Sequence, residues 1–339
     1  MRRWGWTMGM TALFVAGMAS GHWLWRESGA KAAARAAVAR GVRSGPCGGT
    51  RLREQGFPRF AGLASPPTAP ADAPTHPETF LPDAAAFAHV LEQAGTPIEM
   101  ASYSTNFSHA TPSQAGNIAL VARRLTGRVL PAGATFSYNR ALGPFTAAGG
   151  YGWGRMFVGD RIVPSIGGGV CQVASTLYNA VLLSNLSVVE RHPHGLTVPY
   201  LPPGRDATVA DSAGIDFRFR NSSGGPLVLW ASAVDRRLTV RIYGRTPPPH
   251  VEIHTQILAT RPYRTETVRD RHLPPGTSRV VAPGQDGATS RTWVVVTTPQ
   301  GSTRRDLGIT TYRPSPRVIL RGPTRSGGGG VQPSHPRSA

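Results

Sequence analysis

Cysteine and lysine are scarce in this chain of 339 residues, and their scarcity excludes several classes of protein. The chain has two cysteines, too few for a disulfide-stapled scaffold or a Cys-rich zinc module. Lys31 is the only lysine, so nearly all of the positive charge is arginine. Because 40% of the residues are hydrophobic, wholesale disorder is also excluded. The 40 glycines and 31 prolines predict strands, turns and loops rather than a helical bundle.

The formal net charge of +19 raises nucleic acid as a partner. However, the charge is spread along the whole chain, and no Lys/Arg-rich run, zinc-finger spacing or RNA-binding aromatic motif occurs. We therefore expect no nucleic-acid partner. The arginine excess indicates a compositional bias of the source. Its functional alternative is attraction to an anionic surface, such as a membrane or a wall polymer.

The N-terminal segment predicts export from the cytoplasm. Arg2 and Arg3 precede Trp4–Trp25, a run without acidic or basic residues that is long enough to cross a bilayer as a helix. Tryptophans at both ends favour the headgroup layers. The alternatives are a cleaved signal peptide, with Met8–Ala16 as its apolar stretch, and a buried core helix. We expect residues 1–25 to anchor an extracytoplasmic body in the cell membrane, or the body to be secreted if this segment is cleaved.

Composition divides the chain after this segment into four parts. The first is rich in alanine and proline, which predicts a tether with a short helix. The second mixes helical patterns with short strands, and the third is rich in turns and β-branched residues, which predicts a small all-β domain. The fourth is rich in glycine, serine and proline and predicts a disordered tail. Their bounds are 26–98, 99–245, 250–322 and 323–339.

The pattern of apolar residues predicts an α+β fold in which a Cys-bearing helix packs on antiparallel strands. Asp83 is expected to cap the start of the helix predicted over 83–94, and Gly95 is expected to end it. Residues 141–169 are glycine-rich, as in a mobile loop or a set of tight turns beside a site. Helices are expected over 83–94, 114–125 and 171–184, and strands over 187–190, 197–200, 215–219, 227–231, 238–243 and 293–298.

The densest unusual sequence is the run of three glycines, Gly167, Gly168 and Gly169, that precedes Cys171. Three glycines let the backbone turn and let a substrate approach closely. A cysteine at the start of a helix lies at the positive end of the helix dipole, which favours its thiolate. The run therefore predicts a substrate-binding turn beside a nucleophile.

Two histidines and an aspartate follow this cysteine in the chain order of many thiol hydrolases and transpeptidases. His192 and His194 come about twenty residues later, and Asp206 follows them. In that scheme Cys171 attacks a carbonyl, His192 or His194 takes the proton, and Asp206 holds the imidazole. Gln172 or a glycine N–H stabilises the oxyanion.

Other interpretations of these residues stay open. Cys171 alone is also typical of buried packing, and in an exported protein it can pair with Cys47 in a disulfide. Metal binding by Cys171, His192 and His194 is the weaker alternative because no fourth ligand is evident, so we predict no metal or other cofactor. Arg205 is a candidate substrate contact, with an internal ion pair or turn as the alternative.

Aromatic residues in the glycine-rich segment suggest a third hypothesis, a sugar-binding module. Tyr151, Trp153 and Phe157 have rings that can stack on glycan rings, with core packing as the alternative interpretation.

Four separated blocks occur in order over about 100–230: FSYNRALGPFTAAGGYGWG (136–154), GGGVCQVASTLYNAVL (167–182), VERHPHGLTVPYLPPGRDATV (189–209) and DFRFRNSSGGPLVL (216–229). Together they resemble the VanW family. The resemblance implies a bacterial cell-envelope protein, often with a membrane anchor and sometimes followed by a small glycine-named β domain, which 250–322 resembles. Gly195 departs from the serine expected after His-Pro-His. The family is named after a vancomycin-resistance cluster, which is genetic context rather than chemistry.

The leading hypothesis is a cell-envelope protein that acts at or on peptidoglycan, with Cys-dependent acyl transfer or amide hydrolysis on wall peptides as its mechanism and an accessory role in glycopeptide resistance. Its expected partners are peptidoglycan or another anionic wall polymer, and the membrane through the N-terminal segment. The alternative is a non-catalytic wall-binding or scaffold protein.

Overall fold

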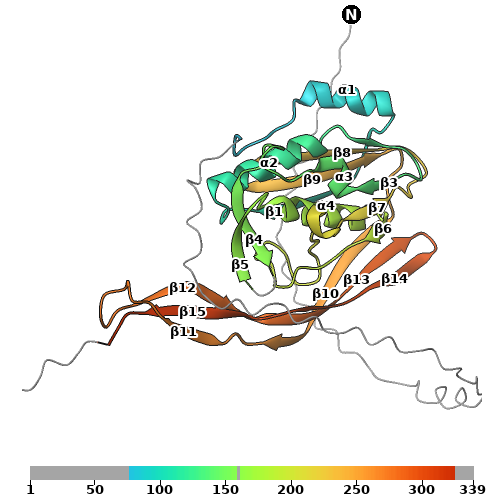
Figure 1. The fold of residues 1–339 in the computed structure, drawn as a ribbon. Coiled ribbons are helices and arrows are strands. Elements are labelled where there is room, and N and C mark those ends of the chain that lie inside the picture. Colours follow the sequence, from blue (N-terminus) through green and yellow to red (C-terminus); the bar gives the residue numbers. More distant parts are fainter. Residues whose placement is uncertain (1–75, 159–160, 325–339) are drawn as a thin grey trace, which may run out of the picture. The chain divides into compact units, whose positions relative to one another are not determined.

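A four-stranded antiparallel sheet organises the larger part of the structure, a computed structural model that describes residues 76–158 and 161–324 (Figure 1). Its strand order is β1-β9-β8-β2, so β8 and β9 lie in the middle of the sheet, between the earlier strands β1 and β2. This arrangement lets helices cover both faces. The strands are β1 (Ile98–Asn106), β2 (Val129–Leu130), β8 (Leu227–Val234) and β9 (Arg237–Gly244).

Two helices, α2 (Pro112–Leu125) and α4 (Val170–Leu183), pack on one face of this sheet. On the other face, α1 (Ala84–Ala94) places Phe87 edge-on against Trp230 and Tyr243. Alternate residues of β8 therefore serve the two faces, as strand geometry requires.

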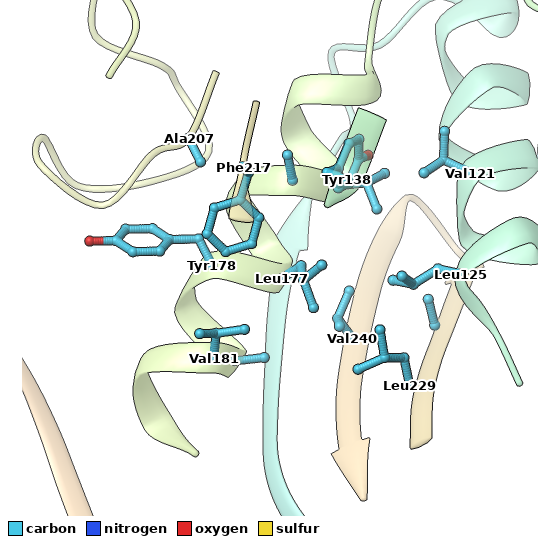
Figure 2. Close-up of a cluster of buried hydrophobic side chains, with 14 of the residues drawn as sticks. Val121, Leu125, Tyr138, Leu177, Tyr178, Val181, Ala207, Phe217, Leu229 and Val240 are labelled. Atoms are coloured by element: carbon cyan, nitrogen blue, oxygen red, sulfur yellow. The ribbon is translucent and has the colours of Figure 1, made fainter. Parts of the chain in front are cut away.

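The core lies between the sheet and the helices α2 and α4 (Figure 2). Leu177 and Val181 of α4 lie one turn apart and contact the sheet where Leu229 and Val240 emerge. Burying side chains of this size stabilises by about 1.5–3 kcal/mol each. The predicted apolar face of the Cys-bearing helix is confirmed.

The starts of the helices follow from local sequence. Asp83 accepts a hydrogen bond from the N–H of Ala86, and α1 ends at Gly95 in the left-handed region. Thr111 and Gln114 form a capping box at the start of α2. The three predicted helices are confirmed, with starts that differ by one or two residues.

Smaller sheets complete the larger part. A three-stranded sheet has the order β3-β7-β6, and a hairpin of two strands occupies much of the glycine-rich segment. The short helix α3 (Tyr138–Leu142) follows directly after β3. The strands are β3 (Thr135–Ser137), β6 (Ser187–Glu190), β7 (Arg218–Arg220), β4 (Trp153–Val158) and β5 (Arg161–Ile166).

The expected strand over 197–200 is wrong, because these residues form an irregular connection. Pro199 removes a backbone donor in the middle of the segment. The carbonyl of Thr197 instead accepts a hydrogen bond of 2.6 Å from the side chain of Gln285, far along the chain. The expected strand over 215–219 starts later than predicted, at Arg218.

The C-terminal part is all-β, as predicted. Two three-stranded sheets have the orders β10-β13-β14 and β11-β15-β12. The α+β fold with a β-rich C-terminus is thus confirmed. The strands are β10 (His250–Arg261), β11 (Thr265–Arg269), β12 (Ser278–Gln285), β13 (Gly287–Thr298), β14 (Gly301–Tyr312) and β15 (Ser315–Arg321).

The predicted anchor, most of the tether and the tail lie outside the described residues. Within 76–158 and 161–324, none of the helices is long and apolar enough to cross a bilayer.

Candidate active site

A polar stripe along α4 fixes the segment that carries Asp206. Cys171, Ser175 and Asn179 are four residues apart and therefore share one side of the helix. The Cys171 thiol donates to the carbonyl of Val209 at 3.4 Å. The hydroxyl of Ser175 accepts from the N–H of Ala207 at 2.9 Å. Asn179 exchanges hydrogen bonds of 2.8 Å with Arg205, through its side-chain nitrogen and oxygen.

The structure brings Cys171, His194 and Asp206 together. Cys171 is the second residue of α4 and is partly exposed. His194 donates through Nδ1 to Oδ2 of Asp206 at 2.6 Å, and its backbone N–H donates to the same oxygen at 2.7 Å. The Cys171 thiol lies close enough to the imidazole of His194 to influence its pKa. This is the chain of contacts that thiol–imidazole catalysis requires.

The second carboxylate oxygen of Asp206, Oδ1, also accepts two hydrogen bonds. Arg191 donates to Oδ1 at 3.0 Å, and the hydroxyl of Tyr312 donates to the same atom. Burial would raise the pKa of Asp206, but the hydrogen bond from His194 and the charges of His194 and Arg191 outweigh it and lower the pKa to about 2. Asp206 is therefore an anion throughout the physiological range.

His194 is almost fully buried, and its surroundings favour the imidazolium. Burial acts to lower its pKa, but the hydrogen bond to Asp206 and the nearness of Cys171 outweigh this effect and raise the pKa to about 9. His194 is thus a cation in the interior, next to Cys171 and Asp206.

His192, the other candidate base, lies elsewhere. Its Nε2 contacts Oε1 of Glu190 at 3.1 Å, and its side chain is 48% exposed. Its backbone forms a β-bridge with Thr208. Of the two histidines that the sequence left open, the structure places only His194 with Cys171 and Asp206.

The side chain of Gln172 faces away from this cluster. Its Nε2 donates to the hydroxyl of Thr105 and to the carbonyl of Asn106, both at 3.0 Å. These contacts tie α4 to β1. Gln172 is thus engaged in contacts within the fold, and a glycine N–H is the other oxyanion donor that the sequence offered.

The three glycines pack closely against three neighbouring segments: Gly167 against Phe145, Gly168 against β4 and Gly169 against α2. A Cβ on Gly168 would lie 2.6 Å from the backbone nitrogen of Arg155, and Gly169 has a φ of +105° where it caps α4. Asn117 of α2 donates to the carbonyl of Gly168 at 2.9 Å. Gly167 also has a positive φ, of +81°. These contacts explain the glycine run by close packing at the start of α4.

The other candidate substrate residues have structural contacts. Tyr151 is buried, and its hydroxyl donates to the carbonyl of Leu142 at 3.2 Å. Trp153 is half-buried at the start of β4. Arg205 lies over the ring of Tyr103, 5.2 Å from its centroid. The side chain of Phe157 lies outside the described residues.

Several residues of the site were missed from the sequence. Tyr200 lies in the connection after His194 and close to Ser175 and Cys171. Tyr312 comes from the C-terminal part, about a hundred residues after Asp206, and no local pattern signals it. The polar stripe on α4 could have been found from its spacing of four residues in an otherwise apolar helix.

The arrangement can activate a thiol and hold the proton it loses. Cys171 forms no disulfide with any residue that the structure describes, and its candidate partner Cys47 lies outside the described residues. Among the residues that the structure describes, no group of three or more His, Cys, Asp or Glu side chains is placed to hold a metal ion.

Comparison with known proteins gives the two parts of the chain their relatives. Residues 113–243 match the family described as VanW like protein, and residues 253–324 match the G5 domain. The resemblance to the VanW family, with a trailing small β domain, is confirmed. This domain content indicates a cell-envelope protein.

Two curated relatives share part of the chain. The uncharacterized protein YoaR of Bacillus subtilis is 36% identical over 161 residues, 48% of this chain and 51% of YoaR. The vancomycin B-type resistance protein VanW of Enterococcus faecalis is 25% identical over 139 residues, 39% of this chain and 50% of that protein. The chain thus spans about half the length of the curated relatives it matches. A solved G5 domain of IgA1 protease aligns as a whole with 24% of this chain, at 20% identity and a TM-score of 0.17.

Proposed function

We propose that this chain, which joins a VanW-like domain to a G5 domain, is a cysteine-dependent acyltransferase or amidase that acts on the peptides of peptidoglycan. The observation that carries the proposal is the contact chain from the Cys171 thiol through His194 to Asp206. Its members come from the start of a helix and from a separate connection, and they meet only because the fold brings them together.

The reaction uses the proton that His194 holds. The Cys171 thiolate attacks the carbonyl carbon of a peptide bond, a C–S bond forms, and the π electrons move to the carbonyl oxygen. When the tetrahedral intermediate collapses, the C–N bond breaks and the leaving amine takes the proton of the His194 imidazolium. The product of this half-reaction is a thioester on Cys171.

The second half-reaction regenerates the site. An amine of another wall peptide, or water, attacks the thioester carbonyl and gives its proton to His194. The C–S bond then breaks and Cys171 leaves as the thiolate. An amine acceptor gives a new cross-link, and water gives hydrolysis, so both reactions use the same residues.

The backbone at the start of α4 supplies the oxyanion donor in this scheme. Cys171 occupies the first turn of the helix, where the backbone N–H groups and the helix dipole favour negative charge. The N–H of Gln172 is already bonded to the carbonyl of Gly169 at 3.0 Å. We assign the oxyanion contact to the N–H of Cys171.

The cellular setting of this proposal is the outer side of the membrane. The N-terminal run of apolar residues supports an anchor or a signal peptide, and the arginine-rich chain suits anionic lipid and wall polymer.

Turnover of purified muropeptides tests the proposal. Cys171→Ser should abolish the change in the muropeptide profile, and Cys47→Ser, which keeps the candidate nucleophile, is the matched control. If Cys171→Ser and wild type convert muropeptides equally, the thiol mechanism is wrong. If neither converts them but both bind sacculi, the chain is a wall-binding protein.

A further inference from the structure

We infer that strand β14 of the G5 domain completes the candidate active site, with Tyr312 as a positioning residue for Asp206. This inference rests on the proposed function, because it takes Asp206 to be the group that orients His194. It goes beyond that function by assigning the second domain a direct role in the chemistry rather than in attachment alone.

Tyr312 touches Asp206 and the turn before it. Its hydroxyl donates to Oδ1 of Asp206 and accepts from the N–H of Gly204 at 2.6 Å. The ring is 2% exposed, and burial raises the pKa of the hydroxyl, so it stays protonated and remains a donor. One side chain from β14 thus fixes both the carboxylate and the backbone that presents it.

Arg191 forms a second link between β14 and Asp206. Its Nη2 donates to Oδ1 of Asp206 at 3.0 Å and its Nε donates to the Asp206 carbonyl at 2.6 Å. Its Nη1 donates to the hydroxyl of Thr310 at 3.3 Å. Thr310 and Tyr312 are two residues apart, so they lie on the same face of the strand.

Backbone contacts hold the connection that carries His194 in the same way. The N–H of Arg313 donates to the carbonyl of Gly195 at 2.8 Å. Gln285 of β12 donates to the carbonyl of Thr197 at 2.6 Å. The residues that follow His194 are therefore bonded to the C-terminal β strands rather than to a neighbouring strand of the VanW-like domain.

The two domains also fit closely around the turn at Gly204. This glycine has a φ of +92°, and a Cβ there would lie 2.9 Å from the hydroxyl of Ser290 and closer still to that of Thr292. Val251 and Val294 are buried in the same apolar cluster as α4. The contact is therefore apolar at its base and polar where it meets Asp206.

Removing the Tyr312 hydroxyl should weaken the interaction of the Asp206 carboxylate with the His194 imidazolium. Oδ1 would keep Arg191 but lose one donor, so the carboxylate would bind its proton more readily and stabilise the imidazolium less. Cys171 should then become a reactive thiolate only at higher pH, so the rising limb of its alkylation profile should move to higher pH.

The test is the rate of Cys171 alkylation against pH in a Cys47→Ser background of the full chain. Tyr312→Phe should slow alkylation below about pH 8.5, the usual pKa of a free thiol, by about tenfold, the worth of a hydrogen bond to a charged group. Tyr263→Phe, an exposed tyrosine of the same domain, is the matched control and should leave the profile unchanged. Thermal unfolding of each variant shows whether it is folded.

A second variant keeps the test valid if Tyr312→Phe does not fold. Thr310→Val removes the hydroxyl that Arg191 binds and keeps the shape of the side chain, so it should shift the profile in the same direction by less. An unchanged profile in folded Tyr312→Phe and Thr310→Val overturns the inference while a reactive Cys171 upholds the proposed function. A Cys171 that is unreactive in the parent overturns both.

Discussion

The chain contains two histidine–carboxylate contacts whose histidines are only two residues apart. One contact is exposed to solvent and the other is buried. His192 and Glu190 meet at the surface, where the imidazole is 48% exposed. His194 and Asp206 meet in the interior, where the side chains are 2% and 1% exposed. A contact open to water contributes little, whereas an enclosed one that is fully hydrogen-bonded shifts the pKa of both groups. A histidine–carboxylate pair therefore becomes a candidate for chemistry only where the fold buries it.

The largest expected effect separates the two histidines in muropeptide turnover. His194→Ala should lower kcat by about 10²–10⁴-fold, the usual contribution of a positioned acid–base group. His192→Ala should change kcat by no more than a small factor, because its side chain contacts Glu190 and water. Steady-state rates of both variants, each shown to be folded by circular dichroism, check this. Equal losses would contradict the assignment.

The next effect separates the two carboxylates in stability. Asp206→Asn removes a buried anion that accepts from Arg191, Tyr312 and His194, and it should destabilise the chain by roughly 3–5 kcal/mol. Glu190→Gln alters a half-exposed group and should cost about 1 kcal/mol or less. Urea unfolding of both variants measures the difference. A smaller loss for Asp206→Asn than for Glu190→Gln would contradict this comparison.

The pH dependence of stability sharpens the same comparison. The pKa of Asp206 is lowered from 3.8 to about 2, so its contribution is present above 3.8 and is lost as pH falls toward 2. The pKa of His194 is raised from 6.5 to about 9, so its contribution is present below 6.5 and is lost as pH rises through 9. The difference in free energy of unfolding between wild type and His194→Gln should therefore be largest between pH 3.8 and 6.5, where both contributions are present. Unfolding curves at graded pH test this, and a gap that grows above pH 9 would contradict it.

The smallest effect concerns the two polar sides of α4. Ser175 ties the helix to Ala207 next to Asp206, whereas Thr176 hydrogen-bonds Thr105 of β1. Both variants, Ser175→Ala and Thr176→Val, should lose about 1 kcal/mol of stability. Only Ser175→Ala should also lower kcat, by a few-fold, because only Ser175 supports the segment of the carboxylate. Equal kcat values would show that this tie has no influence on the site.

Local sequence predicts much of the fold. Asp83 and Gly95 bound α1 because capping is a property of a few neighbouring residues. The apolar spacing around Leu177 gives the buried face of α4 for the same reason. Residues 197–200 were mistaken for a strand, because the contact of Thr197 with Gln285 depends on a partner 88 positions away.

The site is predictable in part. Cys171, a histidine and Asp206 follow from residue type and chain order, but the choice of His194 over His192 depends on which side chain the fold buries. Tyr312 could not be predicted, since its hydrogen bond to Asp206 spans 106 positions and crosses into the second domain. Gln172 was expected at an oxyanion and instead binds β1, because its direction is set by the rotation of α4 about its axis.

The most direct test of the account is the pH profile of Cys171 alkylation in three chains that all carry Cys47→Ser: the parent, His192→Ala and His194→Ala. The account predicts that the parent and His192→Ala react rapidly at pH values below about 8.5, and that His194→Ala reacts only as an isolated thiol does. A Cys171 that reacts equally in all three chains, or in none of them, would contradict the claim that His194 activates this thiol.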